Sequence, residues 1–140
     1  MPFKLRRLMT LPSDKNDEFR KGLDLFNRAH FFDAHEVLED VWRSLPQNGP
    51  RGLPLSQHLR RHVQAVVQLA VAFHHESTRN YIGAHSVLER ALRNLNGADT
   101  SFPDLNLDQL RSDAADWLRH LSGVGPRPRI LQITTRDLMR

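Results

Sequence analysis

The chain has 140 residues, of which 39% are hydrophobic and 26% charged, proportions typical of one globular domain. It contains no cysteine, which excludes disulfide bonds, thiolate metal sites and thiol nucleophiles. No apolar run approaches the roughly 20 residues of a membrane-spanning helix, and the apolar part of the first residues is too short and mixed for a signal peptide. We therefore expect a cytoplasmic protein that makes no membrane contact.

The formal net charge of +4 is unevenly distributed. Residues 1–118 contain fifteen Lys or Arg and fifteen Asp or Glu, so the excess comes from the five arginines at and after Arg119, opposed by Asp137 alone. Such a segment can follow phosphate groups or an acidic partner, or it can lie along an acidic face of its own domain. The last alternative is favoured, and nucleic acid is not an expected partner, because four charges on a neutral body make a small electrostatic footprint.

Helical periodicity begins after the polar residues 13–17, where Phe19 and Phe26 mark one face of a first helix. The pattern restarts immediately after HFFD and predicts a second helix up to residue 45. Residues 46–54, PQNGPRGLP, hold three prolines and two glycines and predict a loop. A third helix is predicted from about residue 56 to residue 78. Its middle, VQAVVQLAVAF (63–73), is apolar on nearly every side, so we expect it to be the most buried segment.

Asn80 is predicted to be the N-cap of a fourth helix that runs through Leu95. The spacing of leucine, alanine and tryptophan residues predicts a fifth helix over about 107–121. The sequence GVGPRPRILQITT that follows cannot be helical at its two prolines, and it predicts an extended segment.

Two segments of the chain resemble each other. AHEVLEDVWRSL (34–45) and AHSVLERALRNL (84–95) align without gaps fifty residues apart, and each would be the second helix of a hairpin. This favours a short repeat of the tetratricopeptide kind, whose two copies close on each other. The expected fold is all-α, a compact bundle of about five helices built from two related helical hairpins. Residues 1–121 are expected to form a single helical domain and residues 122–140 an extended basic tail.

His35, Glu39 and Trp42 are spaced i, i+4, i+7 and therefore share one face of the second helix. This face includes apolar neighbours, so we expect the polar groups to point inward, where they need partners. Gln68 and His75 share one face of the third helix and are the candidate partners.

The sequence HEVLE differs from the zincin motif H-E-x-x-H, because Glu39 stands at the second ligand position. A His–Glu pair can still hold a divalent ion such as zinc or manganese, and His74, His75 or His85 could complete the ligand set. Three interpretations of the cluster remain open: a structural hydrogen-bonded network, a metal site, and a small-ligand or catalytic site.

The other histidines are weaker candidates. His58 and His62 lie beside Arg60 and Arg61, and we expect them on a solvated face. The sequence contains no P-loop, dinucleotide-binding fingerprint or nucleophile elbow.

These residues also resemble a known family. The pattern His35-x-x-x-Glu39-x-x-Trp42 is the hallmark of the bacterial and archaeal domain-of-unknown-function family numbered 309, and VQLAVAFHHESTRNYIGA (67–84) is similar to a second stretch of that family. The resemblance covers about residues 20–95 and implies a small all-helical fold. It also implies a functional role for the motif, with metal binding as the suggested link. The lesser matches are Gln68, His74 and Asn80.

Two classes of function follow. In the favoured class, the protein is a binding or interaction module with a structural polar network, and its partner is a protein. In the alternative class, it binds a divalent metal or a small ligand through His35 and Glu39, and a hydrolytic activity is one form of this alternative. The sequence names neither a reaction nor an oligomeric state.

Overall fold

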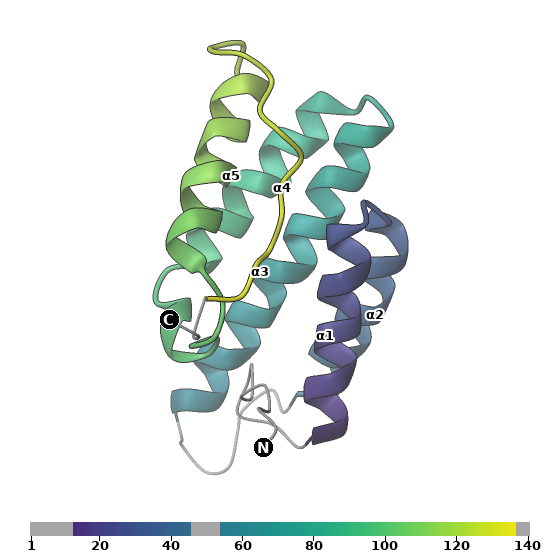
Figure 1. The fold of residues 1–140 in the computed structure, drawn as a ribbon, viewed down its shortest axis with the longest axis vertical. Helices are drawn as coiled ribbons and strands as arrows, with labels where there is room; N and C mark the ends of the chain where they lie inside the picture. The colour runs from purple at the N-terminus through teal and green to yellow at the C-terminus, as the bar shows by residue number, and fades with distance from the viewer. Residues whose placement is uncertain (1–12, 46–53, 137–140) are drawn as a thin grey trace.

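Five α-helices and one short 3-10 helix make up the computed structural model, which describes residues 13–45 and 54–136 (Figure 1). The elements are α1 (Ser13–Asn27), α2 (Phe31–Ser44), α3 (Pro54–Ser77), α4 (Tyr81–Asn94), η1 (Ala98–Thr100) and α5 (Leu107–Leu121). The described ranges contain no β-strand, only an isolated bridge between Leu105 and Thr135, so the predicted all-α bundle of five helices is confirmed. The predicted loop at 46–53 and the chain ends, 1–12 and 137–140, lie outside the described residues.

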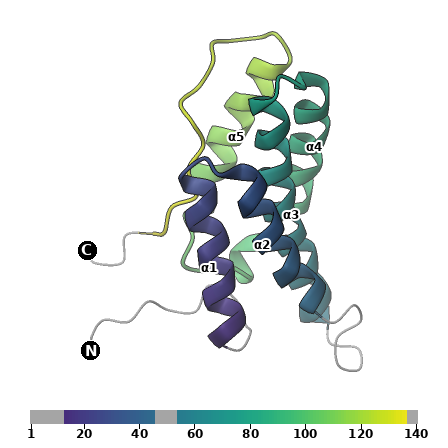
Figure 2. The same ribbon diagram turned by 90° about the vertical axis from the view of Figure 1, so that its right-hand side faces the viewer.

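Each α-helix packs against the next along the chain, α4 against α5 included although η1 lies between them in sequence, and α3 lies at the centre (Figures 1 and 2). The stretch 63–73 of α3 is buried apart from three partly exposed positions, which confirms the expectation for this segment. None of the described helices combines the length and the apolar character that crossing a membrane requires. The helices α1 and α5 are not among the pairs that pack extensively.

A row of buried aromatic side chains joins α3 to the helices on both sides of it. Phe73 of α3 lies edge-on to Phe26 of α1, with 6.1 Å between ring centroids, and to Trp117 of α5, with 5.1 Å. Phe31, the first residue of α2, extends the row at 5.1 Å from Phe26. Edge-to-face geometry adds to the free energy of burying these rings. The row therefore holds α1 and α5 on α3, although α1 and α5 have little contact with each other.

The α1–α2 and α3–α4 turns have the same backbone pattern at positions fifty residues apart. Each contains one residue with left-handed backbone, Ala29 (φ 66°) or Arg79 (φ 67°). The residue after it, His30 or Asn80, donates its backbone N–H to the carbonyl five residues earlier. This arrangement satisfies the last carbonyls of the helix and lets the next helix begin at once. Both turns lie toward the same end of the bundle (Figure 1).

Residues 122–136 follow α5 in an extended conformation and run between α5 and α1, across α3 (Figures 1 and 2). Leu131 and Ile133 are buried in the same core as the helices. Arg127 forms an ion pair with Glu76 of α3, a buried residue. The extended segment therefore covers the side of the bundle that lies between the first and last helices.

Candidate functional site

The His35–Glu39 pair lies on a half-exposed side of α2. His35 Nε2 is 3.0 Å from Glu39 Oε1, and the two side chains are 27% and 29% exposed. Arg43, one turn further on, donates to the other carboxylate oxygen at 3.2 Å. The pair was expected to point inward, but both side chains are partly exposed. The buried face of α2 includes Ala34 and Leu38 instead. The pair satisfies itself within its own helix, where solvent screens the attraction.

Trp42 fastens the end of α2 to α3. The guanidinium of Arg60 lies over the indole ring, 4.0 Å from its centroid. Arg60 also donates to the backbone carbonyls of Trp42 and Leu45, where the last carbonyls of α2 carry partial negative charge. The indole Nε1 is buried and has no hydrogen-bond partner within the described ranges. Trp42 thus acts here through stacking and packing.

Gln68 does not meet the His35–Glu39 pair. Its Oε1 accepts a hydrogen bond of 2.9 Å from Asn94 Nδ2 on α4. A central helix has a neighbour on more than one side, and the face that carries Gln68 packs against α4 rather than α2. The predicted convergence of Gln68 on the pair is therefore wrong.

The remaining candidate residues lie at the end of α3 and in the turn after it. The His74 ring is 5.5 Å from Phe32 of α2, and Phe32 is in turn 6.1 Å from His35. His75 Nδ1 lies 3.3 Å from the side-chain nitrogen of Asn80. Asn80 Oδ1 accepts a hydrogen bond of 3.0 Å from the backbone of Gly83, which confirms the predicted N-cap. His74 therefore approaches the motif through Phe32, whereas His75 and Asn80 belong to the second hairpin turn.

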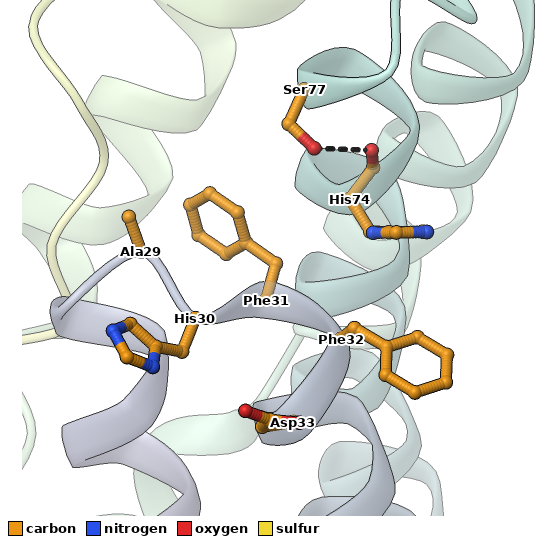
Figure 3. A pocket seen from close by; sticks show the side chains of 7 residues that line it. All are labelled: Ala29, His30, Phe31, Phe32, Asp33, His74 and Ser77. Carbon is orange, nitrogen blue, oxygen red and sulfur yellow. Dashed lines mark hydrogen bonds between the residues drawn. The ribbon is translucent and has the colours of Figure 1, made fainter.

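An open hollow of about 310 Å³ lies between the first hairpin turn and the end of α3 (Figure 3). The rings of Phe32 and His74 are directed to the same side of it, and His30 is directed to the opposite side (Figure 3). Its lining residues are Ala29, His30, Phe31, Phe32, Asp33, His74 and Ser77. The Ser77 hydroxyl donates to the His74 carbonyl at 2.7 Å, an arrangement that does not activate it as a nucleophile. The hollow combines apolar and imidazole side chains.

A second hollow, also of about 310 Å³, lies at the start of α4 and is lined by Tyr81, Ile82, His85, Ser86, Glu89 and Leu121. Ile82 is the second residue of its helix, as Phe32 is in the first hairpin. His85 Nε2 lies 2.9 Å from the Ser122 hydroxyl, which donates to a backbone carbonyl of α5. The serine therefore does not donate to the imidazole as a catalytic nucleophile would.

A closed metal site needs about four ligands. Across residues 13–45 and 54–136, no group of three or more His, Cys, Asp or Glu side chains is placed to hold an ion. His74, His75 and His85 do not complete a ligand set with His35 and Glu39. A metal at the pair would therefore need ligands other than the His, Asp and Glu side chains of the described residues.

His62 is buried, so the expectation of a solvated face is wrong for this residue. It is 1% exposed. Its Nδ1 lies 2.7 Å from Ser101 Oγ and its Nε2 3.1 Å from the Asn96 carbonyl. Burial lowers the pKa of His62, the Asn96 carbonyl opposes this shift, and the charge of Arg61 reinforces it. These hydrogen bonds of His62 hold the connection between α4 and α5 against α3.

The sequence did contain a signal for this burial. His62 follows Leu59 by three positions and precedes Val66 by four, so it falls on the apolar stripe of α3. The neighbouring arginines concealed that pattern. Ser101, its partner, comes from beyond α4 and carried no recognisable signal.

The sequence model of a family described as a domain of unknown function, DUF309, matches residues 19–87. Residues 19–87 belong to the DUF309 family. The DUF309 region starts within α1, contains the His35–Glu39–Trp42 motif and the first hollow, and ends within α4. The helix α5 and the extended segment 122–136 lie outside it.

Two curated bacterial proteins resemble part of the chain. Uncharacterized protein YpuF of Bacillus subtilis (strain 168) is 30% identical over 81 residues, which are 58% of this chain and 41% of the Bacillus protein. An uncharacterized protein of Aquifex aeolicus (strain VF5) is 25% identical over 87 residues, which are 62% of this chain and 23% of the Aquifex protein. The similarity therefore spans less than half of either relative.

Proposed function

We propose that this DUF309 chain is a protein-interaction module that contacts its partner with the end of the bundle where the two hairpin turns lie. The carrying observation is that both turns present a large exposed apolar side chain beside a hollow. Phe32 is 52% exposed and Ile82 86% exposed, at corresponding positions of the two hairpins. An exposed apolar side chain beside a hollow offers a partner apolar area that association can bury. The shared turn geometry supports a common repeat as the origin of this correspondence.

The His35–Glu39–Trp42 motif has a structural part in this proposal. Trp42 and Arg60 fasten one end of α2, while the Phe32 ring lies between His35 and His74 at the other end. Both groups set the position of α2 against α3. The motif therefore supports the orientation in which Phe32 is presented beside the first hollow.

The proposal is tested with the full-length double variant Phe32→Ser/Ile82→Ser. The matched control is Val124→Ser, which removes a 53% exposed apolar side chain from the loop after α5. Proteins cross-linked to each form in cells of the source organism are quantified by mass spectrometry. We expect a set of proteins recovered with wild type and control and reduced about tenfold with the double variant, a change of about 1.4 kcal/mol. Equal recovery with all three folded proteins would contradict the proposal.

The alternative function, a divalent-metal or small-ligand site, is supported by the partial accessibility of the His35–Glu39 pair. His35 and Glu39 are not among the residues that line the first hollow, so this alternative depends on Glu39 rather than on Phe32. Binding that requires Glu39 and tolerates Phe32→Ser would favour this alternative.

A further inference from the structure

The extended segment is bound through its backbone by side chains of two helices. Asn27 of α1 brackets Ile133: its Nδ2 donates to the Ile133 carbonyl at 2.8 Å, and its Oδ1 accepts from the Ile133 N–H at 2.7 Å. Trp117 Nε1 of α5 donates to the Arg129 carbonyl at 2.9 Å. Side chains that pair with main-chain groups hold an extended peptide with little regard to its sequence.

Alternate side chains of the segment supply the specificity. Leu131 and Ile133 are buried, whereas Ile130 and Gln132 are exposed. This alternation is that of an extended strand with one face against the protein. At the end of the segment near Ile133, the surface beneath it therefore accepts two apolar side chains separated by one residue.

A charged anchor lies at the other end. Arg127 pairs with Glu76, a buried carboxylate of α3, and its guanidinium lies 4.9 Å from the centroid of the Trp117 ring. A buried carboxylate beside an aromatic face selects a planar cation. The surface under the segment includes Asn27, Glu76 and Trp117, and we call it the seam. The seam thus accepts the pattern Arg-x-x-x-Leu-x-Ile.

The segment is joined to α5 by a link that lies on the surface. Residues 122–126 are all exposed. Gly123 and Gly125 have φ values of 85° and 103°, which few other residues adopt. Displacement of residues 127–136 would therefore require rearrangement of an exposed link, with no change within α5.

We propose that the seam is a recognition site for an extended segment of a partner protein with the pattern Arg-x-x-x-Leu-x-Ile, and that residues 127–136 occupy it as an internal competitor. This surface adjoins the hairpin-turn end, because Asn27 and Glu76 lie at the ends of α1 and α3. It uses other side chains than Phe32 and Ile82 and does not depend on the function proposed for that end. A tethered segment acts at an effective concentration of the order of millimolar, so an external segment binds by displacing it. Weakening the internal segment raises the apparent affinity for the external one.

The test uses the full-length variant Leu131→Asp/Ile133→Asp, which disfavours occupation by the internal segment. The probe is a fluorescein-labelled peptide of residues 126–136, PRPRILQITTR, followed by fluorescence anisotropy. The control peptide has Asp in place of the residues that correspond to Leu131 and Ile133. We expect saturable binding of the probe by wild type and at least about tenfold tighter binding by the variant. Adding Asn27→Ala to the variant should weaken binding about tenfold, because the bracket around the peptide backbone is lost.

Circular dichroism accompanies the titration. If the variant loses helical signal, recovery on addition of the probe and not of the control peptide supports the proposal. A folded variant that does not bind the probe, an unfolded variant that the probe does not restore, or a wild type without saturable binding at millimolar peptide would overturn it. A wild-type dimer that the tail substitutions abolish would assign the seam to a second copy of the chain and overturn the partner assignment.

Discussion

His62 is the residue whose environment most directly links structure to solution behaviour. Its imidazole is buried against Ser101 and the Asn96 carbonyl, and burial lowers its pKa. The folded chain therefore binds a proton at this site less readily than the unfolded chain does. The contribution to stability is fully present above the ordinary histidine pKa of about 6.5, and it is lost as the pH falls from there toward the lower pKa of the folded state.

This predicts that stability falls between pH 7.5 and pH 5 more steeply in wild type than in His62→Gln, which keeps an amide but does not titrate. Urea unfolding followed by circular dichroism measures both slopes. The seven other histidines are common to both proteins and cancel in the difference. Identical pH slopes would show that His62 is not held in its neutral form.

Glu39 has a more modest role, because its partners are reached from a half-exposed helix surface. We expect Glu39→Ala to lower the free energy of unfolding by less than about 1 kcal/mol, as is usual for such pairs. The melting temperatures of wild type and variant should shift equally with added Zn²⁺ or Mn²⁺. A rise confined to the wild type would instead support a metal site that uses His35 and Glu39.

At the scale of secondary-structure elements, the two hairpins offer a matched comparison of helix caps. Asn80 accepts a hydrogen bond from the Gly83 N–H at the start of α4, whereas His30, at the same position before α2, makes no side-chain cap. We expect Asn80→Ala to cost about 1 kcal/mol and His30→Ala clearly less. Thermal and urea unfolding of the two variants measure the difference. Equal losses would mean that the turn backbone, and not the cap, determines the stability of these helix starts.

Also at this scale, α3 distributes its polar groups between two neighbours. Arg60 and His74 meet residues of α2, while Gln68 meets Asn94 of α4. The sequence of α3 does not show which of these polar residues will face α2 and which will face α4. The positions of the two neighbouring helices decide it. This division separates the motif of α2 from the polar residues that seemed suited to complete it.

At the scale of the whole molecule, the extended segment contributes to the core that the helices share. Leu131 is buried between elements, whereas Ile130, the residue before it, is exposed. We expect Leu131→Ala to cost about 2–5 kcal/mol, because it leaves a cavity, and Ile130→Ala to cost at most about 0.5 kcal/mol. Unfolding in urea measures both. Similar small losses for the two variants would show that the segment is held only loosely.

The whole molecule presents two neighbouring surfaces for which different partners are proposed. The hairpin-turn end carries Phe32 and Ile82, and the seam lies along the bundle between α1 and α5. The two surfaces adjoin, because Asn27 and Glu76 lie at the ends of α1 and α3, but they use different side chains. The two proposals can therefore fail or succeed independently.

The sequence by itself determined the helices, because apolar periodicity, prolines and capping residues act within a few positions of one another. It predicted the central place of residues 63–73 and the cap at Asn80 for that reason. It also placed His35 and Glu39 one turn apart, where they pair. The family resemblance marked the same residues.

Only the tertiary structure decided which faces meet. Asn27 binds Ile133, 106 positions away, and His62 binds Ser101, 39 positions away. Periodicity records which side of a helix is apolar, but not which neighbour covers that side or how deeply. Those outcomes depend on the packing of all elements together, which is why the exposure of the His35–Glu39 pair, the burial of His62 and the seam required the structure.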